Sequence, residues 1–261
     1  MTIAMCQIPM SLTIAGNCRH IVDAITEANA DLAVFPECAL TGYNYVMGGD
    51  ISRSKLDEAF LQIQAACRAS KTAAIFGAPF FGSPEQYKPW NAAIVVNIEG
   101  ELITVQPKIV FTDDEIRNDI FLPAEPESRS SFQLNGKTCA ILICSEFAGV
   151  VGSYTSSHCY RILEGLNTKL DAVFVIGVMD MGPHSKGNSL AEEAARHFDA
   201  DFIVVNTAEW GFGTPTGNLG GSKIVSRKGE LLVQAVFDEP SITKHKLSEP
   251  TTVEAVAIYA D

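Results

Sequence analysis

The sequence lacks any hydrophobic run long enough to cross a lipid bilayer. Its longer apolar runs, such as Ala172 to Val178, end well short of the roughly 18 to 20 residues that a membrane-spanning helix needs. The first residues, Met1 to Met5, have neither the basic segment nor the cleavage site of a secretory signal, and they are typical of a first strand. We therefore expect a cytoplasmic protein with no membrane partner.

Positive charge is also scarce. Lys and Arg together number 19 against 31 Asp and Glu, which gives a formal net charge of −12. Most of such a surface would repel the phosphate backbone of a nucleic acid or an anionic membrane. Since 47% of the residues are hydrophobic, the composition indicates a globular protein whose partner is neither nucleic acid nor membrane.

Paired cysteines are missing. No C-x-x-C motif occurs, and the cysteines form an odd set of seven, which disfavours a zinc site and a disulfide framework. We expect most of them to be small buried hydrophobic residues and expect no metal. They are Cys6, Cys18, Cys38, Cys67, Cys139, Cys144 and Cys159.

Two common functional motifs are absent as well. The pentapeptide G-x-S-x-G of many serine hydrolases does not occur. The glycine-dense stretch 211–221 is followed by Ser222 and Lys223, which stand in the wrong order for a phosphate-binding loop. The sequence therefore gives little support to a serine esterase or a nucleotide-binding protein.

What the sequence does contain is an alternation of strands and helices. Helical spacing occurs over Asn17 to Asn29, Lys55 to Ser70, Ser157 to Asn167 and Ser189 to Asp199. Short β-branched runs predict strands at Ile3 to Ile8, Asp31 to Phe35, Ala73 to Phe76, Ala92 to Ile98, Leu102 to Val105, Thr138 to Cys144, Asp171 to Ile176, Asp201 to Val205, Lys223 to Val225 and Leu231 to Phe237.

This pattern runs once before residue 106 and again after residue 137, so the chain has two similar halves of the α/β class. The segment between them, Thr112 to Ser131, is rich in Asp, Glu, Pro and Ser and has no clear period. We interpret it as a long functional loop, because each half is too small to stand alone. One domain over residues 1–261 is expected.

Three predicted strands end on residues that could carry chemistry: Glu37, Lys108 and Cys144. Taken singly, the glutamate fits a solvated turn, the lysine fits the surface and the cysteine fits the core. Together they form a coherent set, because a thiolate attacks a carbonyl only if a base takes its proton and a cation or dipole supports the developing charge.

At these positions the chain resembles the nitrilase superfamily, the carbon–nitrogen hydrolases, whose signature is a Glu, a Lys and a Cys at three successive strand ends. The matching segments are Asp31–Glu37 with Leu40–Tyr43, Pro107–Lys108 and Ile141–Cys144. The resemblance implies a four-layer αββα sandwich, a homodimer or larger homo-oligomer, and no metal or organic cofactor.

The resemblance also implies roles for particular residues. Glu37 would accept the proton of Cys144, while Lys108 and the backbone N–H of Ser145 would hold the oxyanion. A second glutamate commonly follows the lysine in the family, and Glu115 matches it best. Asp113 and Asp114 compete for that role, and an ordinary acidic turn remains an alternative.

The substrate-binding residues are less defined. Tyr43, Phe147 and Trp210 would either wall the pocket or pack as core or interface aromatics. Ser145-Glu146-Phe147 stands where amidase and carbamoylase relatives often place an aromatic, an aspartate and an arginine. The missing basic residue argues against N-carbamoyl amino acids and leaves a small linear amide as the expected substrate.

Other functions remain open at this point. A nitrilase or a carbamoyl hydrolase would use the same fold, and a non-catalytic binding or assembly protein could keep the fold without the chemistry. A redox-sensing cysteine protein would need a resolving thiol near Cys144, whereas Cys139, five residues back in the same strand, should face the other side of the sheet.

Overall fold

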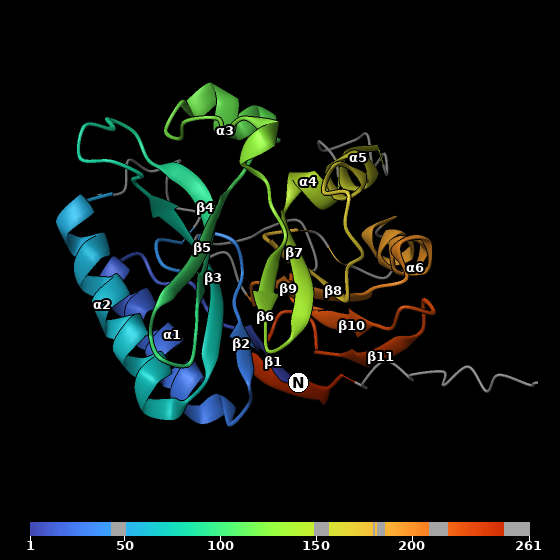
Figure 1. Ribbon diagram of the computed structural model, residues 1–261. Helices are drawn as coiled ribbons and strands as arrows, with labels where there is room; N and C mark the ends of the chain where they lie inside the picture. Colours follow the sequence, from blue (N-terminus) through green and yellow to red (C-terminus); the bar gives the residue numbers. More distant parts are fainter. Residues whose placement is uncertain (43–50, 149–156, 180, 182–185, 209–218, 248–261) are drawn as a thin grey trace, which may run out of the picture.

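The computed structural model describes residues 1–42, 51–148, 157–179, 181, 186–208 and 219–247. Two mixed β-sheets lie face to face between layers of helices (Figure 1). The first sheet has the strand order β12-β1-β2-β3-β4-β5, and the second has the order β11-β10-β9-β8-β7-β6. The expected four-layer αββα sandwich is therefore confirmed.

The first sheet comes from the first half of the chain and one late strand. Its parallel centre is β1 (Thr2–Gln7), β2 (Leu32–Val34) and β3 (Ala73–Phe80), and β4 (Trp90–Val96) and β5 (Leu102–Pro107) continue it antiparallel. The late strand β12 (Ser241–Lys246) pairs antiparallel with β1.

The second sheet repeats this plan. Its parallel centre is β7 (Lys137–Ile143), β8 (Ala172–Gly177) and β9 (Asp201–Asn206), flanked by β6 (Phe132–Leu134) on one side and by β10 (Lys223–Val225) and β11 (Leu231–Gln234) on the other. The two halves predicted from the sequence thus each supply the centre of one sheet.

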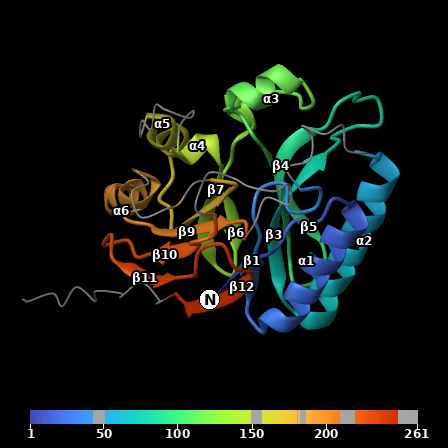
Figure 2. The ribbon, with the colours of Figure 1, turned by 180° about the vertical axis from the view of Figure 1, so that it is seen from behind.

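Alternation along the strands of the first sheet explains the layers. In β1, Ile3 and Met5 pack into the core between the sheets, whereas Ala4 and Cys6 pack under the helices. Because successive side chains of a strand point to opposite faces, a strand that is apolar throughout must be covered on both sides. Helices α1 (Ile14–Ala28) and α2 (Arg53–Ser70) cover that outer face, as both views show (Figures 1 and 2).

Helices α5 (Ser157–Gly165) and α6 (Lys186–Phe198) cover the outer face of the second sheet (Figure 2). Ile162 and Leu163 of α5 and Ala191 and Ala194 of α6 join the same buried cluster as the strands beneath them. In the part of the chain that the structure describes, no helix is long and apolar enough to cross a membrane.

The predicted loop over Thr112 to Ser131 needs correction, because it contains the short helix α3 (Asp113–Asn118) and a 3-10 turn at Pro126–Ser128. Six residues are too few to show a helical period, so the pattern missed α3. Its cause is local: Thr112 and Glu115 form a capping box, in which each side chain bonds the backbone N–H of the other residue.

Two strands were not expected from the sequence. β6 is only three residues long. β12 combines partly buried residues with the exposed Lys244 and Lys246 instead of forming an apolar run. Both lie at the edge of a sheet, where one side of the strand faces no partner strand among the described residues. Edge strands carry polar residues more often than central strands, which weakens their sequence signal.

Candidate active site

Three strand ends meet in one buried cluster. Glu37 follows β2, Lys108 follows β5, and Cys144 follows β7 of the opposite sheet. The ammonium of Lys108 lies 2.7 Å from Oε1 of Glu37, and both side chains are fully buried. The sequence alone would place the glutamate in a solvated turn and the lysine on the surface. In the structure the two are partners in the interior.

Glu115 joins the cluster from α3. The Lys108 ammonium donates to both of its carboxylate oxygens, at 3.0 and 2.8 Å. The backbone N–H and the hydroxyl of Thr112 donate to Oε2 of the same carboxylate, so the capping box that starts α3 also fixes this side chain. Asp113 and Asp114 are exposed, so the structure brings Glu115 and neither aspartate to the lysine.

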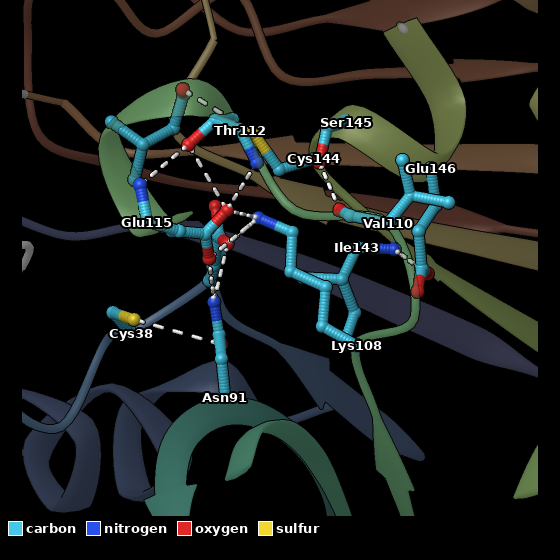
Figure 3. Close-up of polar contacts among 12 residues, drawn as sticks. Cys38, Asn91, Lys108, Val110, Thr112, Glu115, Ile143, Cys144, Ser145 and Glu146 are labelled. Atoms are coloured by element: carbon cyan, nitrogen blue, oxygen red, sulfur yellow. Dashed lines mark hydrogen bonds and ion pairs between the residues drawn. The ribbon is translucent and has the colours of Figure 1, made fainter. Parts of the chain in front are cut away.

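Asn91, on β4, is a member of the cluster that the sequence did not predict as a site residue. Its amide nitrogen donates to Oε1 of Glu37 and to Oε1 of Glu115, both at 2.8 Å (Figure 3). Its oxygen accepts a bond from the thiol of Cys38 at 3.7 Å. The sequence signal for Asn91 was an amide within an otherwise apolar strand. In the structure this amide is buried, and a buried amide needs hydrogen-bond partners.

The cluster holds two carboxylates on one lysine. Burial raises the pKa of Glu37, and the neighbouring Glu115 adds to this, although Lys108 opposes it. Burial disfavours the charge of Lys108, but Glu37, Cys144 and Glu115 outweigh it and raise the pKa of the lysine well above its ordinary value. The lysine therefore stays an ammonium, and Glu37 is a stronger base than a solvated glutamate.

Cys144 is a neutral thiol in this environment. Burial and, after it, the charge of Glu37 raise its pKa, and Lys108 only partly offsets them. The thiol donates to the carbonyl oxygen of Val178 at 3.7 Å. A thiol that is not ionised by its surroundings needs a base to take its proton before it can act as a nucleophile.

The backbone turns sharply at the cysteine. Cys144 has φ of +47°, in the left-handed region that residues with a Cβ rarely occupy. Its N–H still bonds the carbonyl of Ile176 on β8, and the short helix α4 (Ser145–Ala148) begins immediately after it. Strain of this kind, held in place by surrounding hydrogen bonds, is often found at functional sites.

The hydroxyl of Ser145 donates to the carbonyl oxygen of Val110, just beyond Lys108, as drawn in Figure 3. In that view the Lys108 ammonium has Asn91 on one side and the sulfur of Cys144 on the other. The segments that carry the lysine and the cysteine are therefore tied together across the two sheets.

The three aromatic candidates have different outcomes. Phe147 is fully buried, with its ring centroid 6.3 Å from that of Phe202, and its part in a substrate pocket stays a prediction. Tyr43 and Trp210 lie outside the described residues.

A cavity of about 380 Å³ lies apart from this cluster, between α1 and α2. Cys18, Ala59, Thr41 and Phe121 are among its lining residues, whereas Glu37, Lys108 and Cys144 are not. Among the residues that the structure describes, no three His, Cys, Asp or Glu side chains are grouped so as to hold a metal ion.

Comparison with known proteins gives a match over nearly the whole chain. The family model described as carbon-nitrogen hydrolase matches residues 2–254. Comparison with curated protein sequences found no match.

Solved structures share the fold at low identity. A mutant of the amidase from Nesterenkonia sp. AN1, with acrylamide added at its active-site cysteine, has a TM-score of 0.78 and 21% identity over 95% of this chain and 93% of that one. Another mutant of that amidase, in complex with butyramide, has a TM-score of 0.78 and 20% identity over 95% and 90% of the two chains. The glutamine-dependent NAD+ synthetase from Acinetobacter baumannii has a TM-score of 0.77 and 20% identity, over 93% of this chain and 44% of that chain.

Proposed function

The chain belongs to the carbon–nitrogen hydrolase family, and we propose that it is an amidase that releases ammonia from a small linear amide through a thioester on Cys144. The observation that carries the proposal is the buried ion pair of Glu37 and Lys108 beside a cysteine at a strained strand end. The amidase from Nesterenkonia sp. AN1, with its acrylamide adduct and its butyramide complex, supports an amide as the substrate class.

In the first half of the reaction, Glu37 takes the proton of Cys144, and the thiolate attacks the amide carbonyl carbon. The carbonyl electrons move onto oxygen, where the Lys108 ammonium and the N–H of Ser145 stabilise the negative charge. Collapse of this intermediate breaks the C–N bond, and Glu37 returns the proton to the leaving nitrogen. Ammonia departs and a thioester remains.

In the second half, Glu37 takes a proton from water, and the resulting hydroxide attacks the thioester carbonyl. The C–S bond breaks, the acid leaves, and the proton returns to the thiolate of Cys144. One base thus serves both halves, which requires a carboxylate whose pKa lies closer to neutrality than that of a solvated glutamate. The raised pKa of Glu37 meets this requirement.

Lys108 keeps a hydrogen available for the oxyanion. Its ammonium has three hydrogens; one bonds Oε1 of Glu37, and a single hydrogen shared between the two oxygens of Glu115 can satisfy the second carboxylate. In this proposal Glu115 and Asn91 hold the lysine and Glu37 in place, and only the remaining hydrogen of Lys108 turns to the substrate.

The proposal includes the organisation of the protein. We infer one catalytic domain over residues 1–261, a small-molecule amide as the partner, and a homodimer or larger homo-oligomer that extends the sandwich across an interface, as the family resemblance implies. A nitrilase and a carbamoyl hydrolase remain the alternatives within the family, and a non-catalytic assembly protein the alternative outside this chemistry.

Ammonia release by the wild type and by Cys144→Ala, over a panel of aliphatic amides, ω-amido acids, carbamoyl compounds and nitriles, tests the proposal. We expect turnover of at least one amide by the wild type and its loss in the variant. Cys139→Ala is the matched control and should leave turnover unchanged, because Cys139 is also a buried cysteine and lies within β7, the strand that Cys144 follows.

Two results would contradict the proposal. Turnover of nitriles or carbamoyl compounds alone would assign the chain to another branch of the family. The non-catalytic alternative would be favoured if no compound of the panel released ammonia and if iodoacetamide alkylated Cys144 no faster than the other cysteines.

A further inference from the structure

A second buried ion pair lies next to the candidate active site. Nη2 of Arg129 is 2.5 Å from Oε1 of Glu146, and the two side chains are 2% and 0% exposed. Arg129 follows the 3-10 turn at Pro126–Ser128, and Glu146 lies in α4, two residues after Cys144. The proposed reaction uses neither residue.

Glu146 bonds the backbone on both sides of the site. Its Oε1 accepts the N–H of Ile109, and its Oε2 accepts the N–H of Ile143, both at 2.7 Å. Ile109 directly follows Lys108, and Ile143 directly precedes Cys144. One carboxylate therefore joins the segment that carries the lysine to the segment that carries the cysteine.

Arg129 completes the connection from the other side. Its Nη2 donates to the carbonyl oxygen of Pro107 at 2.9 Å, and its Nη1 donates to that of Ile141 at 3.2 Å. Together with Glu146, the arginine thus holds the peptide groups on either side of Lys108, and it holds β7 just before the cysteine. Pro107 is the last residue of β5 in the first sheet, and Ile141 lies in β7 of the second. The Arg129–Glu146 pair therefore bridges the two sheets.

Such a pair is not explained by stability alone. Two charges taken out of water lose hydration that their attraction only roughly repays, so a buried ion pair contributes little net stability compared with apolar packing. A pair whose hydrogen bonds end on four backbone groups does, however, fix where those groups lie. In a reaction that depends on near-contact geometry, a displacement of about 1 Å can cost about a hundredfold in rate.

We propose that Arg129 and Glu146 are positioning residues that fix Lys108 relative to Cys144 across the two sheets. The inference rests on the proposed function for its kinetic consequence, but the placement of the lysine beside the thiol can be measured without a substrate. A displaced Lys108 would support the Cys144 thiolate less well and would leave the oxyanion without its cation.

Glu146→Gln tests the proposal with the smallest change of shape. An amide has one acceptor oxygen, so it can accept from Ile109 or from Ile143 but faces the other N–H with a donor group. We expect the rate of Cys144 alkylation by iodoacetamide, followed by peptide mass spectrometry across pH, to fall about tenfold, with its pH profile shifted upward. On any amide that the wild type hydrolyses, we expect kcat to fall by a similar factor with KM little changed.

Asp201→Asn is the matched control. Asp201 is a buried carboxylate that accepts the N–H of Arg227 at 2.9 Å and lies at the start of β9, whereas the candidate site lies at strand ends. Asp201→Asn makes the same carboxylate-to-amide change at another buried carboxylate. We expect its melting temperature to fall as that of Glu146→Gln does, while the alkylation profile of Cys144 stays that of the wild type.

Arg129→Lys provides the second variant, because an ammonium keeps the charge but cannot reach Pro107, Ile141 and Glu146 with the span of a guanidinium. This variant tests the positioning role if Glu146→Gln does not fold. We again expect slower alkylation of Cys144, with its pH profile shifted to higher pH. Folded variants with wild-type alkylation profiles would overturn the inference. Wild-type protein that hydrolyses no amide would refute the proposed function, but the alkylation comparison would still test the placement of Lys108.

Discussion

At the scale of the residue, the site depends on how few donors serve many acceptors. The Lys108 ammonium and the Asn91 amide each bond both buried carboxylates, and Thr112 adds two bonds to Glu115 alone. Within the described residues, Oε2 of Glu37 has no hydrogen-bond partner. A buried carboxylate oxygen without a donor is costly to the folded protein. It is also the atom left open to receive a proton from the thiol or from water.

The raised pKa of Glu37 predicts a particular pH dependence of stability. In the unfolded chain this carboxyl titrates near its ordinary value of 4.5, and in the folded protein it holds its proton to higher pH. Its contribution to stability is therefore fully present below about pH 4.5 and is lost as the pH rises through the folded pKa.

Glu37→Gln removes this titration while keeping the shape of the side chain. The free energy of unfolding of the wild type, measured with urea from pH 4.5 upward, should fall relative to that of the variant as the pH rises. A difference between the two proteins that stays constant, or that changes in favour of the wild type, would show that the folded pKa of Glu37 is not raised.

At the scale of the element, α3 couples a local folding signal to the site. Thr112 caps the helix, and its N–H and hydroxyl also hold the carboxylate of Glu115 that contacts Lys108. α3 is short, with Glu115 as its one buried residue, so tertiary packing contributes little to its formation. The cap therefore determines both whether the helix begins and where Glu115 points.

Thr112→Val and Thr13→Val separate these two effects. Thr13 caps α1 by accepting the N–H of Gly16 at 3.1 Å, so both variants lose an N-cap and should lose about 1 kcal/mol of stability. Only Thr112→Val should also lower amide turnover, because only it removes a hydrogen bond to the carboxylate of Glu115. Equal turnover in the two variants at a temperature where both are folded would mean that the cap does not act on the site.

At the scale of the whole molecule, the two sheets are joined by polar contacts as well as by the shared core. Gln7, at the end of β1, donates to the carbonyl oxygens of Val236 and Glu239, and its own oxygen accepts from the N–H and hydroxyl of Ser222. One buried side chain of the first sheet thus bonds Ser222 and Val236, which lie beside β10 and β11 of the second sheet, as well as Glu239, which precedes β12.

Gln7→Met keeps the length of this side chain and removes all four bonds. Because the buried N–H and hydroxyl of Ser222 would lose their bonds to Gln7, we expect the free energy of unfolding to fall by about 1–3 kcal/mol. Gln133→Met is the control, since Gln133 is exposed on β6, and it should change stability by no more than about 0.5 kcal/mol. Equal denaturation midpoints for the two variants would contradict this role of Gln7.

Much of the architecture was readable from local pattern. Apolar, β-branched runs identified the central strands of both sheets, since strands covered on both faces must be apolar throughout. The edge strands β6 and β12 and the helix α3 were not predicted, because a short or half-exposed element has too few residues with a periodic apolar pattern. Their existence depends on a neighbouring strand or a cap rather than on their own composition.

The sequence by itself determined the plan of two α/β halves, the family resemblance and the strand ends at which Glu37, Lys108 and Cys144 stand, because these follow from periodicity and order along the chain. Only the tertiary structure decided that Glu115, and neither neighbouring aspartate, reaches Lys108, that Asn91 joins the two carboxylates, and that Arg129 and Glu146 span the sheets. The physical reason is that these contacts join residues on different elements, and a buried polar group finds its partner by position in space.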